Sequence, residues 1–478
     1  MTLKKALNNI PYLECLSRIS KESDIRLWLV GGFLRDVFLR KKKELLDFDF
    51  CVERKTFSFV HTFRKYVKAK AIVLDEKQKS YRVIVKRKGK VYTYDFTQLR
   101  GKDLREDLLL RDFTINTLAV DISTYPESRI IDLWGAKKDL LHKCIRALSE
   151  KVIVDDPLRI LRAFSLSGAY GFKIDKNTEK FLVKHKALLK RVSKERINEE
   201  LFKILSLPSS YPTIKMMSQL RIIDEIIPYI TVQRNVFQGD YHHLDVWGHA
   251  LETLLRFELM LKNRISKDKK LFDYLYAPIT SKHRLVDIIK LACLLHDAGK
   301  PFAKKIKDKK TIFHTHEKIG RDLMEDVYRR LKLSQKEKEV LKRLIFWHLR
   351  PGYLADQCYP SKRAVYRFFR DTASEGVAVI LLSLADWRAT RGPLTDSKKR
   401  RRHERIMFKL IDYYFKEKNK KPLPKLIDGF DIMRRFKLGP SPIIGKILGK
   451  VKEEQALGKV RTRQEALRLA RRMVESKK

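Results

Sequence analysis

In the stretch Leu45-Leu46-Asp47-Phe48-Asp49-Phe50, two carboxylates stand one residue apart between apolar side chains. Side chains alternate faces along a strand, so both aspartates project to one side and both phenylalanines to the other. Burial of the apolar face fixes the register and holds the carboxylates close together at a strand end. Such a pair suits two divalent cations about 4 Å apart, which clamp the attacking and leaving oxygens of a phosphoryl transfer. The stretch therefore predicts a catalytic metal site on a sheet.

A glycine pair lies just upstream, in Leu29-Val30-Gly31-Gly32-Phe33-Leu34-Arg35-Asp36. Glycine lets the backbone turn sharply and approach a phosphate closely, and the helix expected to follow offers its N-terminus to an anion. Each motif alone is common, because charged strand pairs are usually solvated and glycines often precede helices. In this order and spacing, the two motifs together resemble the head of a nucleotidyltransferase domain of the polymerase-beta superfamily.

Charge predicts the kind of partner. The chain has 478 residues, and its 105 lysines and arginines against 58 aspartates and glutamates give a net charge of +47. The positive charge is spread along the whole chain, which favours a polyanion and, beside a phosphoryl-transfer site, a nucleic acid. The alternative is a general charge excess of the kind found in lysine-rich thermophile chains.

Cysteine usage and hydropathy predict the compartment. The cysteines are few, odd in number, widely spaced and without a CxxC pair: Cys15, Cys51, Cys144, Cys293 and Cys358. This usage argues against a disulfide framework or a cysteine–zinc site and fits a reducing cytosol. The N-terminus shows no apolar signal segment and no run reaches membrane-spanning length, so we expect a cytoplasmic protein with no membrane partner.

The pattern along the chain predicts an α+β protein. Short apolar alternations indicate strands in the first part, at residues 72–74, 81–85 and 92–96, and helical spacing dominates from about residue 150. We therefore expect a mixed sheet-and-helix head (1–145), a helical neck (146–235), a histidine-rich helical domain (236–400) and a basic helical region (401–478). The last region is interrupted at Leu438-Gly439-Pro440-Ser441-Pro442.

Asp95 is a candidate third carboxylate. It lies near the end of the alternating segment 91–96, where it could join Asp47 and Asp49. A strand-end aspartate that only makes a turn is nearly as good an interpretation.

A further block makes the resemblance specific: Leu110-Arg111-Asp112-Phe113-Thr114-Ile115-Asn116-Thr117. With the glycine and aspartate motifs, it makes the chain similar to class II tRNA nucleotidyltransferases, the family of CCA-adding enzymes and poly(A) polymerases. Leu110 and Thr117 depart mildly from the family's arginine and alanine. The resemblance implies Mg²⁺ at Asp47 and Asp49. It also implies a set of nucleotide-binding residues: Gly31, Gly32, Arg35, Arg111, Asp112 and Asn116.

Within that set, the resemblance assigns Arg111 and Asn116 to the triphosphate or sugar and Asp112 to positioning their loop. It implies CTP and ATP as substrates. The basic helical body and tail would grip the acceptor arm of a tRNA by its shape and phosphates.

The segment Asp155-Asp156-Pro157-Leu158-Arg159 matches the family's EDxxR block, with Asp155 in place of glutamate. We expect it to open a helix, with Pro157 in the first turn and the acids as caps. Cytosine and adenine both offer an amino donor beside a ring acceptor, which Asp156 and Arg159 could read together. Guanine and uracil would leave both groups unpaired. Arg162, one turn further, would assist with base or phosphates. The alternative is a capped helix with an ion pair.

A second set of ligand-type residues lies in the histidine-rich part. An adjacent His-Asp is joined at long intervals by more histidines and an aspartate, a donor set that holds transition or other divalent metals. The set resembles an HD domain, a metal-dependent phosphohydrolase fold. By that resemblance the core ligands are His249, His296, Asp297 and Asp386. A second metal position would take His316 and His348.

Several functions remain open. Only fifteen residues, 96–110, separate Asp95 from the next block; complete CCA-adding enzymes carry a longer flexible loop there, which leans toward an enzyme that adds only CC. An A-adding enzyme and a poly(A) polymerase share the head motifs. A different class is an HD phosphohydrolase on RNA ends whose head only binds RNA, although the intact aspartate pair argues against it. An RNA chaperone would explain the charge but not two ligand sets. The sequence predicts no oligomeric state.

Overall fold

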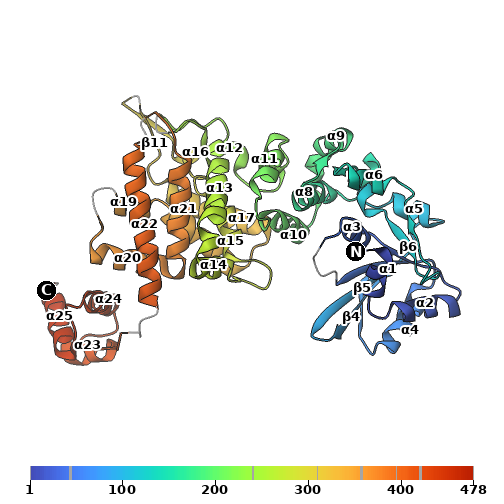
Figure 1. Cartoon of the computed structure of the whole chain (residues 1–478). Coiled ribbons are helices and arrows are strands. Elements are labelled where there is room, and N and C mark those ends of the chain that lie inside the picture. Colours follow the sequence, from blue (N-terminus) through green and yellow to red (C-terminus); the bar gives the residue numbers. More distant parts are fainter. Residues whose placement is uncertain are drawn as a thin grey trace. The chain divides into compact units, whose positions relative to one another are not determined.

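A computed structural model describes residues 2–41, 46–239, 242–308, 310–355, 359–393, 396–418 and 423–476. The chain forms two compact units (Figure 1). The first comprises Met1–Leu207 and Met216–Ile226, and the second comprises Pro208–Lys215 and Ile227–Lys478. The fold is a mixed sheet with helices followed by helical parts, as the sequence predicts.

The first unit is built on a seven-stranded sheet in the order β3-β4-β5-β2-β1-β6-β7. Only β2 and β5 pair in parallel, and the other neighbours are antiparallel. The strands are β1 (Leu27–Val30), β2 (Asp47–Val52), β3 (Ala71–Asp75), β4 (Ser80–Arg87), β5 (Lys90–Gln98), β6 (Ala119–Asp121) and β7 (Ile130–Ile131). The three segments expected as strands are confirmed within β3, β4 and β5.

An aromatic layer fixes the register of β2. Phe48 and Phe50 are buried, and their rings lie 5.2 Å from those of Tyr94 and Phe96 on β5. Phe63 of α4 (Thr56–Tyr66) packs on the same layer, 5.3 Å from the ring of Tyr94. Because a slip of one residue would turn these rings to solvent, the opposite face of β2 must carry both aspartates.

Short helices surround the sheet and continue into the neck. In the head these are α1 (Leu3–Asn8), α2 (Leu13–Glu22), α3 (Gly32–Phe38), α5 (Leu104–Leu109), the 3-10 turn η1 (Thr114–Asn116) and α6 (Ala136–Leu141). A small parallel pair, β8 (Cys144–Ile145) and β9 (Lys173–Ile174), leads to the neck. The neck holds α7 (Glu150–Asp155), α8 (Arg159–Tyr170), α9 (Lys176–His185), η2 (Lys186–Arg191), α10 (Lys194–Leu205), α11 (Tyr211–Gln219), η3 (Ile223–Glu225) and α12 (Ile230–Gln233).

The expected helix start at Asp155-Asp156-Pro157 is wrong. Asp155 ends α7 and Pro157 lies between the helices, while α8 begins at Arg159 without a side-chain cap. Asp156 is extended, with φ −139° and ψ 93°. The cause is the proline, whose ring disfavours the helical conformation of the residue before it.

The second unit is helical except for one hairpin, β10 (Lys305–Lys307) with β11 (Lys310–Ile312). Its centre is α21 (Gly376–Ala389), which is apolar and buried along most of its length and contacts α13 (Val246–Asn263) and α15 (Leu285–Leu295). The surrounding elements are η4 (Ile265–Lys267), α14 (Lys269–Tyr276), α16 (Lys300–Ala303), α17 (His316–Leu331), α18 (Gln335–Trp347), α19 (Arg350–Ala355), α20 (Lys362–Thr372), η5 (Ala373–Glu375) and α22 (Ser397–Lys418). The expected boundary at residue 400 falls inside α22.

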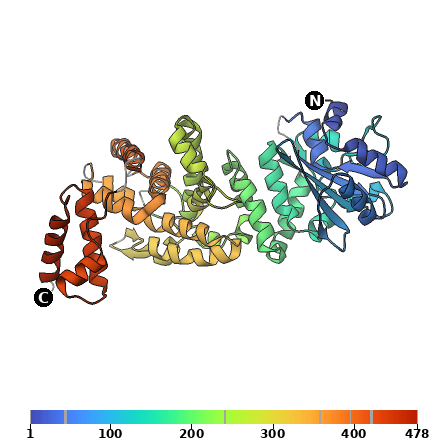
Figure 2. The ribbon, with the colours of Figure 1, turned by 90° about the horizontal axis from the view of Figure 1, so that it is seen from below.

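Three C-terminal helices form a tail with its own core (Figure 2). They are α23 (Gly429–Phe436), α24 (Pro442–Ala456) and α25 (Arg463–Glu475). Buried side chains from all three, including Ile432, Ile447 and Ala466, pack together. The interruption expected at residues 438–442 is confirmed, since α23 ends at Phe436 and α24 begins at Pro442.

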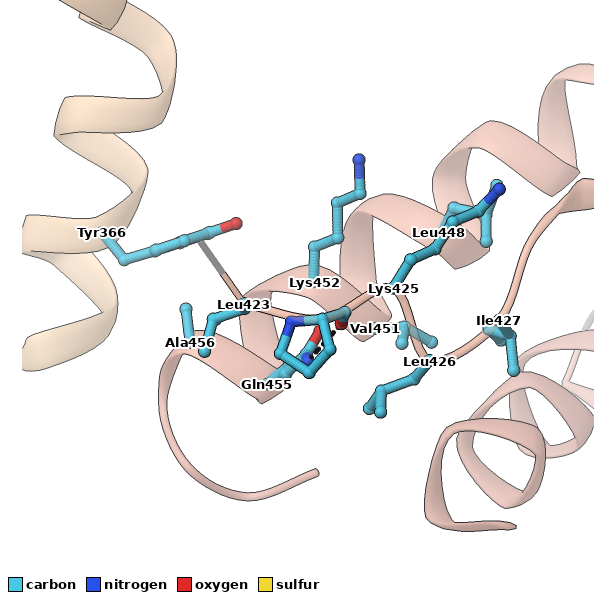
Figure 3. A pocket seen from close by; sticks show the side chains of 11 residues that line it. Tyr366, Leu423, Lys425, Leu426, Ile427, Leu448, Val451, Lys452, Gln455 and Ala456 are labelled. Atoms are coloured by element: carbon cyan, nitrogen blue, oxygen red, sulfur yellow. Dashed lines mark hydrogen bonds between the residues drawn. The ribbon is translucent and has the colours of Figure 1, made fainter. Parts of the chain in front are cut away.

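Charged side chains join the tail to α20. The buried Glu453 carboxylate of α24 accepts hydrogen bonds of 2.9 and 3.0 Å from Arg367, and Arg363 lies 3.1 Å from it. Arg363 also reaches Glu454 at 2.6 Å. Beside this contact, which we call the α20–α24 clamp, Tyr366 and α24 line a pocket of about 420 Å³ (Figure 3).

Two further expectations concern cysteines and membranes. The four cysteines in the described part of the chain are free thiols: Cys15, Cys51, Cys144 and Cys293. Cys358 lies outside the described residues. No helix within the described ranges is long and apolar enough to cross a membrane.

Candidate active sites

The head presents its carboxylates on the open face of the sheet. Asp47 and Asp49 are exposed on β2, and Asp49 pairs across the parallel ladder with Asp95 of β5. Surrounding protein atoms nevertheless desolvate Asp49 and raise its pKa; Arg111 opposes this rise, and Asp95 and Asp47 add to it. A carboxylate shifted by two like charges has the environment that a bound cation would relieve.

Asp95 lies in the interior of β5 rather than near its end. Both of its oxygens accept 2.7 Å hydrogen bonds from Arg82 on the neighbouring strand β4. The predicted third carboxylate is therefore beside Asp49, but a bidentate guanidinium already holds it. This partner was not foreseen, because only the β4–β5 register brings Arg82 opposite Asp95.

Gly31 is where a backbone must come close to two charged groups. Its φ is +81°, which favours glycine, and a Cβ there would lie 3.2 Å from Nη1 of Arg111 and 3.6 Å from Oδ2 of Asp49. Arg111 lies 3.6 Å from the carboxylate of Asp107, and its buried Nε has no hydrogen-bond partner in the described structure. A glycine at position 31 thus leaves unfilled the space between the Asp49 carboxylate and the Arg111 guanidinium.

The other predicted nucleotide-binding side chains form a buried network. Nη1 of Arg35 donates to Oδ1 of Asn116 at 2.6 Å, and Nδ2 of Asn116 donates to Asp112 at 2.8 Å. Arg162 of α8 closes the chain with hydrogen bonds of 2.7 and 2.9 Å to Asp112. Burial alone would raise the pKa of Asp112, but Arg162 and Asn116 lower it.

The far end of this network also reaches the neck. The guanidinium of Arg35 contacts Asp36 at 3.0 Å and the hydroxyl of Tyr170, the last residue of α8. Tyr170 in turn donates to Asp36 at 2.6 Å. Gly32 opens α3, and a Cβ there would come within 3.4 Å of Nη2 of Arg35. Arg35 and Asp36 of the head are therefore linked by hydrogen bonds to Tyr170 of the neck.

Asp156 and Arg159 do not pair with each other. Oδ2 of Asp156 accepts from Arg196 of α10 at 2.8 Å, while its Oδ1 has a longer contact of 3.3 Å with the backbone N–H of Leu158. Arg159 donates to the carbonyls of Leu110 at 2.8 Å and Val152 at 3.1 Å. The carboxylate and the guanidinium are thus anchored separately.

The HD-type residues come together as predicted, in two buried groups that meet at one carboxylate. One group comprises His249, His296 and Asp386, and the other comprises Asp297, His316 and His348; within each group the ligand atoms lie within 4.8 Å of one another. Oδ2 of Asp297 lies 3.2 Å from His296, and its Oδ1 lies 3.3 and 3.7 Å from His316 and His348. Asp297 therefore faces both groups.

Backbone carbonyls fix the orientation of three imidazoles. Nδ1 of His296, His316 and His348 lies 3.0, 2.8 and 2.6 Å from the carbonyl oxygen three residues before each of them. Donation from Nδ1 leaves the Nε2 lone pairs toward the centre, and these buried Nε2 atoms have no hydrogen-bond partner in the described structure. This donor set fits a divalent metal. His296 and Asp297 directly follow α15 rather than lie inside it.

Three residues without a predicted role border this centre. Nζ of Lys300 lies 2.7 Å from Asp297 and 2.6 Å from Oε1 of Gln238. The ring of His242 lies edge-on 4.8 Å from that of His249, and burial lowers the pKa of His242 to about 3. Of the three, only Lys300 could have been suspected from the sequence, because a lysine three residues after Asp297 is well placed for an ion pair with it.

The charges of the HD centre favour a cation. Burial would raise the pKa of Asp297, but His296 and Lys300 lower it well below its usual range. The pKa of Asp386 is lowered in the same way, mainly by His249, whose Nε2 lies 2.8 Å away. Burial lowers the pKa of His348, which favours its neutral, ligating form.

Comparison with protein families divides the chain into three matched parts. Residues 27–146 match the poly A polymerase head domain, and residues 171–233 match the probable RNA and SrmB- binding site of polymerase A. Residues 246–391 match the HD domain.

Curated relatives match nearly the whole chain. An A-adding tRNA nucleotidyltransferase of Deinococcus radiodurans is 29% identical over 455 residues, covering 94% of this chain and 95% of the relative. A CC-adding tRNA nucleotidyltransferase of Thermus thermophilus is 26% identical over 446 residues, covering 91% of each chain. A CCA-adding enzyme of Thermotoga maritima, solved with tRNA, shares the fold with a TM-score of 0.64 at 19% identity, over 100% of this chain and 99% of that one.

The fold and the matched parts define a nucleotidyltransferase head joined to a helical neck and an HD domain. Over nearly its whole length the chain resembles A-adding and CC-adding tRNA nucleotidyltransferases, and it carries a match to the poly A polymerase head domain together with an HD domain.

Proposed function

We propose that the protein is a template-independent nucleotidyltransferase that adds C, A or both to the 3′ end of tRNA. The observation that carries the proposal is the meeting of Asp49, Gly31 and Arg111 at one corner of the sheet. The names of the Deinococcus and Thermus relatives support tRNA as the acceptor. Structures of CCA-adding enzymes with ATP and with CTP support the two nucleotides.

In this proposal Asp47 and Asp49 hold Mg²⁺, and Asp95 supports them from the neighbouring strand. Bound Mg²⁺ would activate the primer 3′-hydroxyl and neutralise the triphosphate. Arg111 offers its guanidinium to the triphosphate, since its Nη1 lies beside the backbone of Gly31. Arg35, Asn116 and Asp112 hold the loop that carries Arg111.

Base choice falls to Asp156 and Arg159. A carboxylate accepts from the amino group of cytosine or adenine, and a guanidinium donates to the adjacent ring nitrogen. Uracil and guanine offer the reverse pattern and leave both side chains unpaired, which a binding site penalises heavily. Arg162 acts through Asp112 in this proposal, since its Nε and Nη2 both donate to Oδ2 of that carboxylate.

The remaining parts are proposed to serve the tRNA. The domain plan is a head (1–145), a neck (146–235), an HD domain (236–400) and a basic region (401–478), of which the basic helical parts hold the acceptor arm. A net charge of +47 supports contact with phosphates, and free thiols support a reducing cytoplasm.

An extension assay tests the proposal. Protein and Mg²⁺ are mixed with tRNA transcripts that end before CCA, at C and at CC, and each receives CTP, ATP or both. Growth to CCA identifies a complete enzyme. A stop at CC identifies a CC-adding enzyme, as the fifteen residues between Asp95 and Arg111 favour. Extension of the CC end alone identifies an A-adding enzyme, and a long A tail identifies a poly(A) polymerase. No extension of any transcript would contradict the proposal.

We further infer a second activity, phosphohydrolysis at the HD centre. The observation that favours it is the set of buried, unpartnered Nε2 atoms facing Asp297. His249, His296, Asp297 and Asp386 would hold one divalent transition metal, and His316 and His348 would complete a second position with Asp297. Such a metal would lower the pKa of an attacking water. Hydrolysis of phosphate monoesters and 2′,3′-cyclic phosphates on RNA ends, with added metals, tests this activity.

A further inference from the structure

Among the charged side chains of helix α10 in the neck, Arg196 and Glu200 stand four residues apart and therefore lie on one face. Glu200 is buried and binds α8, accepting 2.7 Å from the hydroxyl of Ser165 and lying 3.8 Å from Arg162. Arg196 reaches past the start of α8 to Asp156, in the extended link between α7 and α8.

The contact between Arg196 and Asp156 uses one oxygen only. Nη2 of Arg196 donates to Oδ2 at 2.8 Å, while Oδ1 keeps the longer contact of 3.3 Å with the N–H of Leu158. An ionised carboxylate has about four lone-pair sites, two on each oxygen. Oδ1 therefore retains capacity to accept a further hydrogen bond while Arg196 fixes the plane of the carboxylate.

No helix holds this carboxylate in place. Asp156 precedes Pro157, has an extended backbone, and lies beyond the end of α7. Arg159 is anchored elsewhere, on the carbonyls of Leu110 and Val152. Among the described hydrogen bonds, the side chain of Asp156 has only Arg196 and the N–H of Leu158 as partners.

We propose that Arg196 is a positioning residue for base selection: it holds Asp156 so that Oδ1 accepts the amino group of cytosine or adenine. The inference rests on the proposed nucleotide addition and names a determinant of its specificity. A fixed carboxylate cannot turn away from the O4 carbonyl of uracil, so Arg196 penalises the wrong base as well as favouring the right one. Without Arg196, the carboxylate rotates, and both effects weaken.

The test compares R196A, R196K and K194A with the wild type. Lys194 is an exposed cation on the same helix, so K194A removes one positive charge without touching Asp156. Two quantities are measured for CTP and for UTP: kcat/KM with a tRNA transcript that lacks CCA, and Kd by calorimetry. Misplacement of a contact group costs about 10²-fold, so R196A should lose about that factor in kcat/KM for CTP and much less for UTP.

R196K should recover most of the CTP preference, because a single donor suffices for Oδ2. K194A should keep the CTP preference of the wild type, since any loss of a tRNA phosphate contact would lower kcat/KM for CTP and UTP equally. In a D156N background, R196A should add little further loss, since it acts through that carboxylate. An equal loss for CTP and UTP, unchanged kinetics, or tighter CTP binding by R196A would overturn the inference. Failure of the wild type to extend any transcript would instead overturn the proposed nucleotide addition. Circular dichroism and Tm verify that each variant folds.

Discussion

The head and the HD domain hold their carboxylates in opposite ways. In the head, strand register places Asp47 and Asp49 on an exposed face, whereas the HD centre gathers buried ligands from helix ends. Within the described residues, only the HD centre brings three ligand atoms within 4.8 Å of one another. In the proposed function, the HD centre is therefore complete by itself, whereas the head site needs its substrate to complete it.

The metals proposed for the two sites account for this difference. Mg²⁺ is usually held by one or two carboxylates together with substrate phosphates, so an open pair of aspartates is sufficient. Imidazoles suit transition metals and need fixed orientation, which the carbonyls behind His296, His316 and His348 supply. The comparison predicts separable sites that respond differently to the same perturbations.

The largest expected effect is on the head. D47N/D49N removes the charges proposed to hold Mg²⁺, and metal stabilisation of a transition state is worth several kcal/mol, so nucleotide addition should fall by about 10³-fold or more. Single-nucleotide extension of a tRNA transcript measures this loss. Metal content and phosphohydrolysis at the HD centre serve as the control and should not change. Addition within tenfold of the wild type would contradict the role of the pair.

The reciprocal change is H296A/D297A in the HD centre. Asp297 faces both ligand groups, so its loss should empty both metal positions and reduce any phosphohydrolysis by about 10²-fold or more. Metal content per chain is measured by mass spectrometry after dialysis. Nucleotide addition should stay within about twofold, because the two sites share no residue and belong to different compact units, so their substitutions should act independently. Loss of both activities together would contradict the separation of the sites.

A smaller effect is expected from G31A. The φ of +81° strains any other residue, and the new Cβ would crowd Arg111 at 3.2 Å. We expect kcat/KM for the nucleotide to fall by about tenfold to 10²-fold, as for a small misplacement of a contact group. G89A, which also has a positive φ but meets nothing within 4 Å, is the matched control for strain alone. Equal losses in both variants would show that crowding at Arg111 is unimportant.

The smallest effect on activity is expected from a change in a residue that supports the HD centre, and this change acts on stability. Glu337 lies in the first turn of α18, and His348 directly follows the last residue of that helix. Hydrogen bonds from His283 and Ser334 outweigh burial and lower the pKa of Glu337 to about 2. Its ordinary pKa is 4.5, so its charged form stabilises the fold above pH 4.5, and this contribution disappears as the pH falls toward 2.

E337Q should therefore reduce the free energy of unfolding by about 3 kcal/mol at pH 7. Urea titrations of E337Q and the wild type between pH 2 and pH 7 measure the difference, which should shrink at the acid end. A difference that is independent of pH would show that the carboxylate charge does not supply this stability.

Local pattern predicted much of the molecule. The alternation of apolar and acidic residues around Asp47 and Asp49 was sufficient to predict the strand and to assign its side chains to two faces. The six residues proposed as ligands of the HD centre were found by resemblance, since they are far apart in the sequence and only the packing of helices brings them together. The predicted helix start was wrong. Proline is accepted in the first turn of a helix, but Pro157 also disfavours a helical backbone at Asp156, and this second effect decided the local structure.

The partners of two carboxylates of the candidate site could not be predicted from the sequence. Arg82 meets Asp95 only through strand register, and Arg196 meets Asp156 across forty positions of sequence. Both arginines lie in sequence segments that predict a solvent-exposed side chain, so no ion pair was expected for either of them. Such contacts between elements decide which side chains of the site are free to bind a ligand, and only the folded structure identifies them.

The α20–α24 clamp has a consequence for truncated forms of the protein. Arg363 and Arg367 stand four residues apart on α20, and their ion-pair partners are Glu453 and Glu454 of the tail. A chain cut after α22 would lose both glutamates and leave two neighbouring guanidinium groups without counter-charge. In such a fragment the two arginines would be free to bind RNA phosphates, whereas in the intact protein the glutamates neutralise them. A change in RNA binding on truncation would therefore report the newly exposed arginines and not only the loss of the tail.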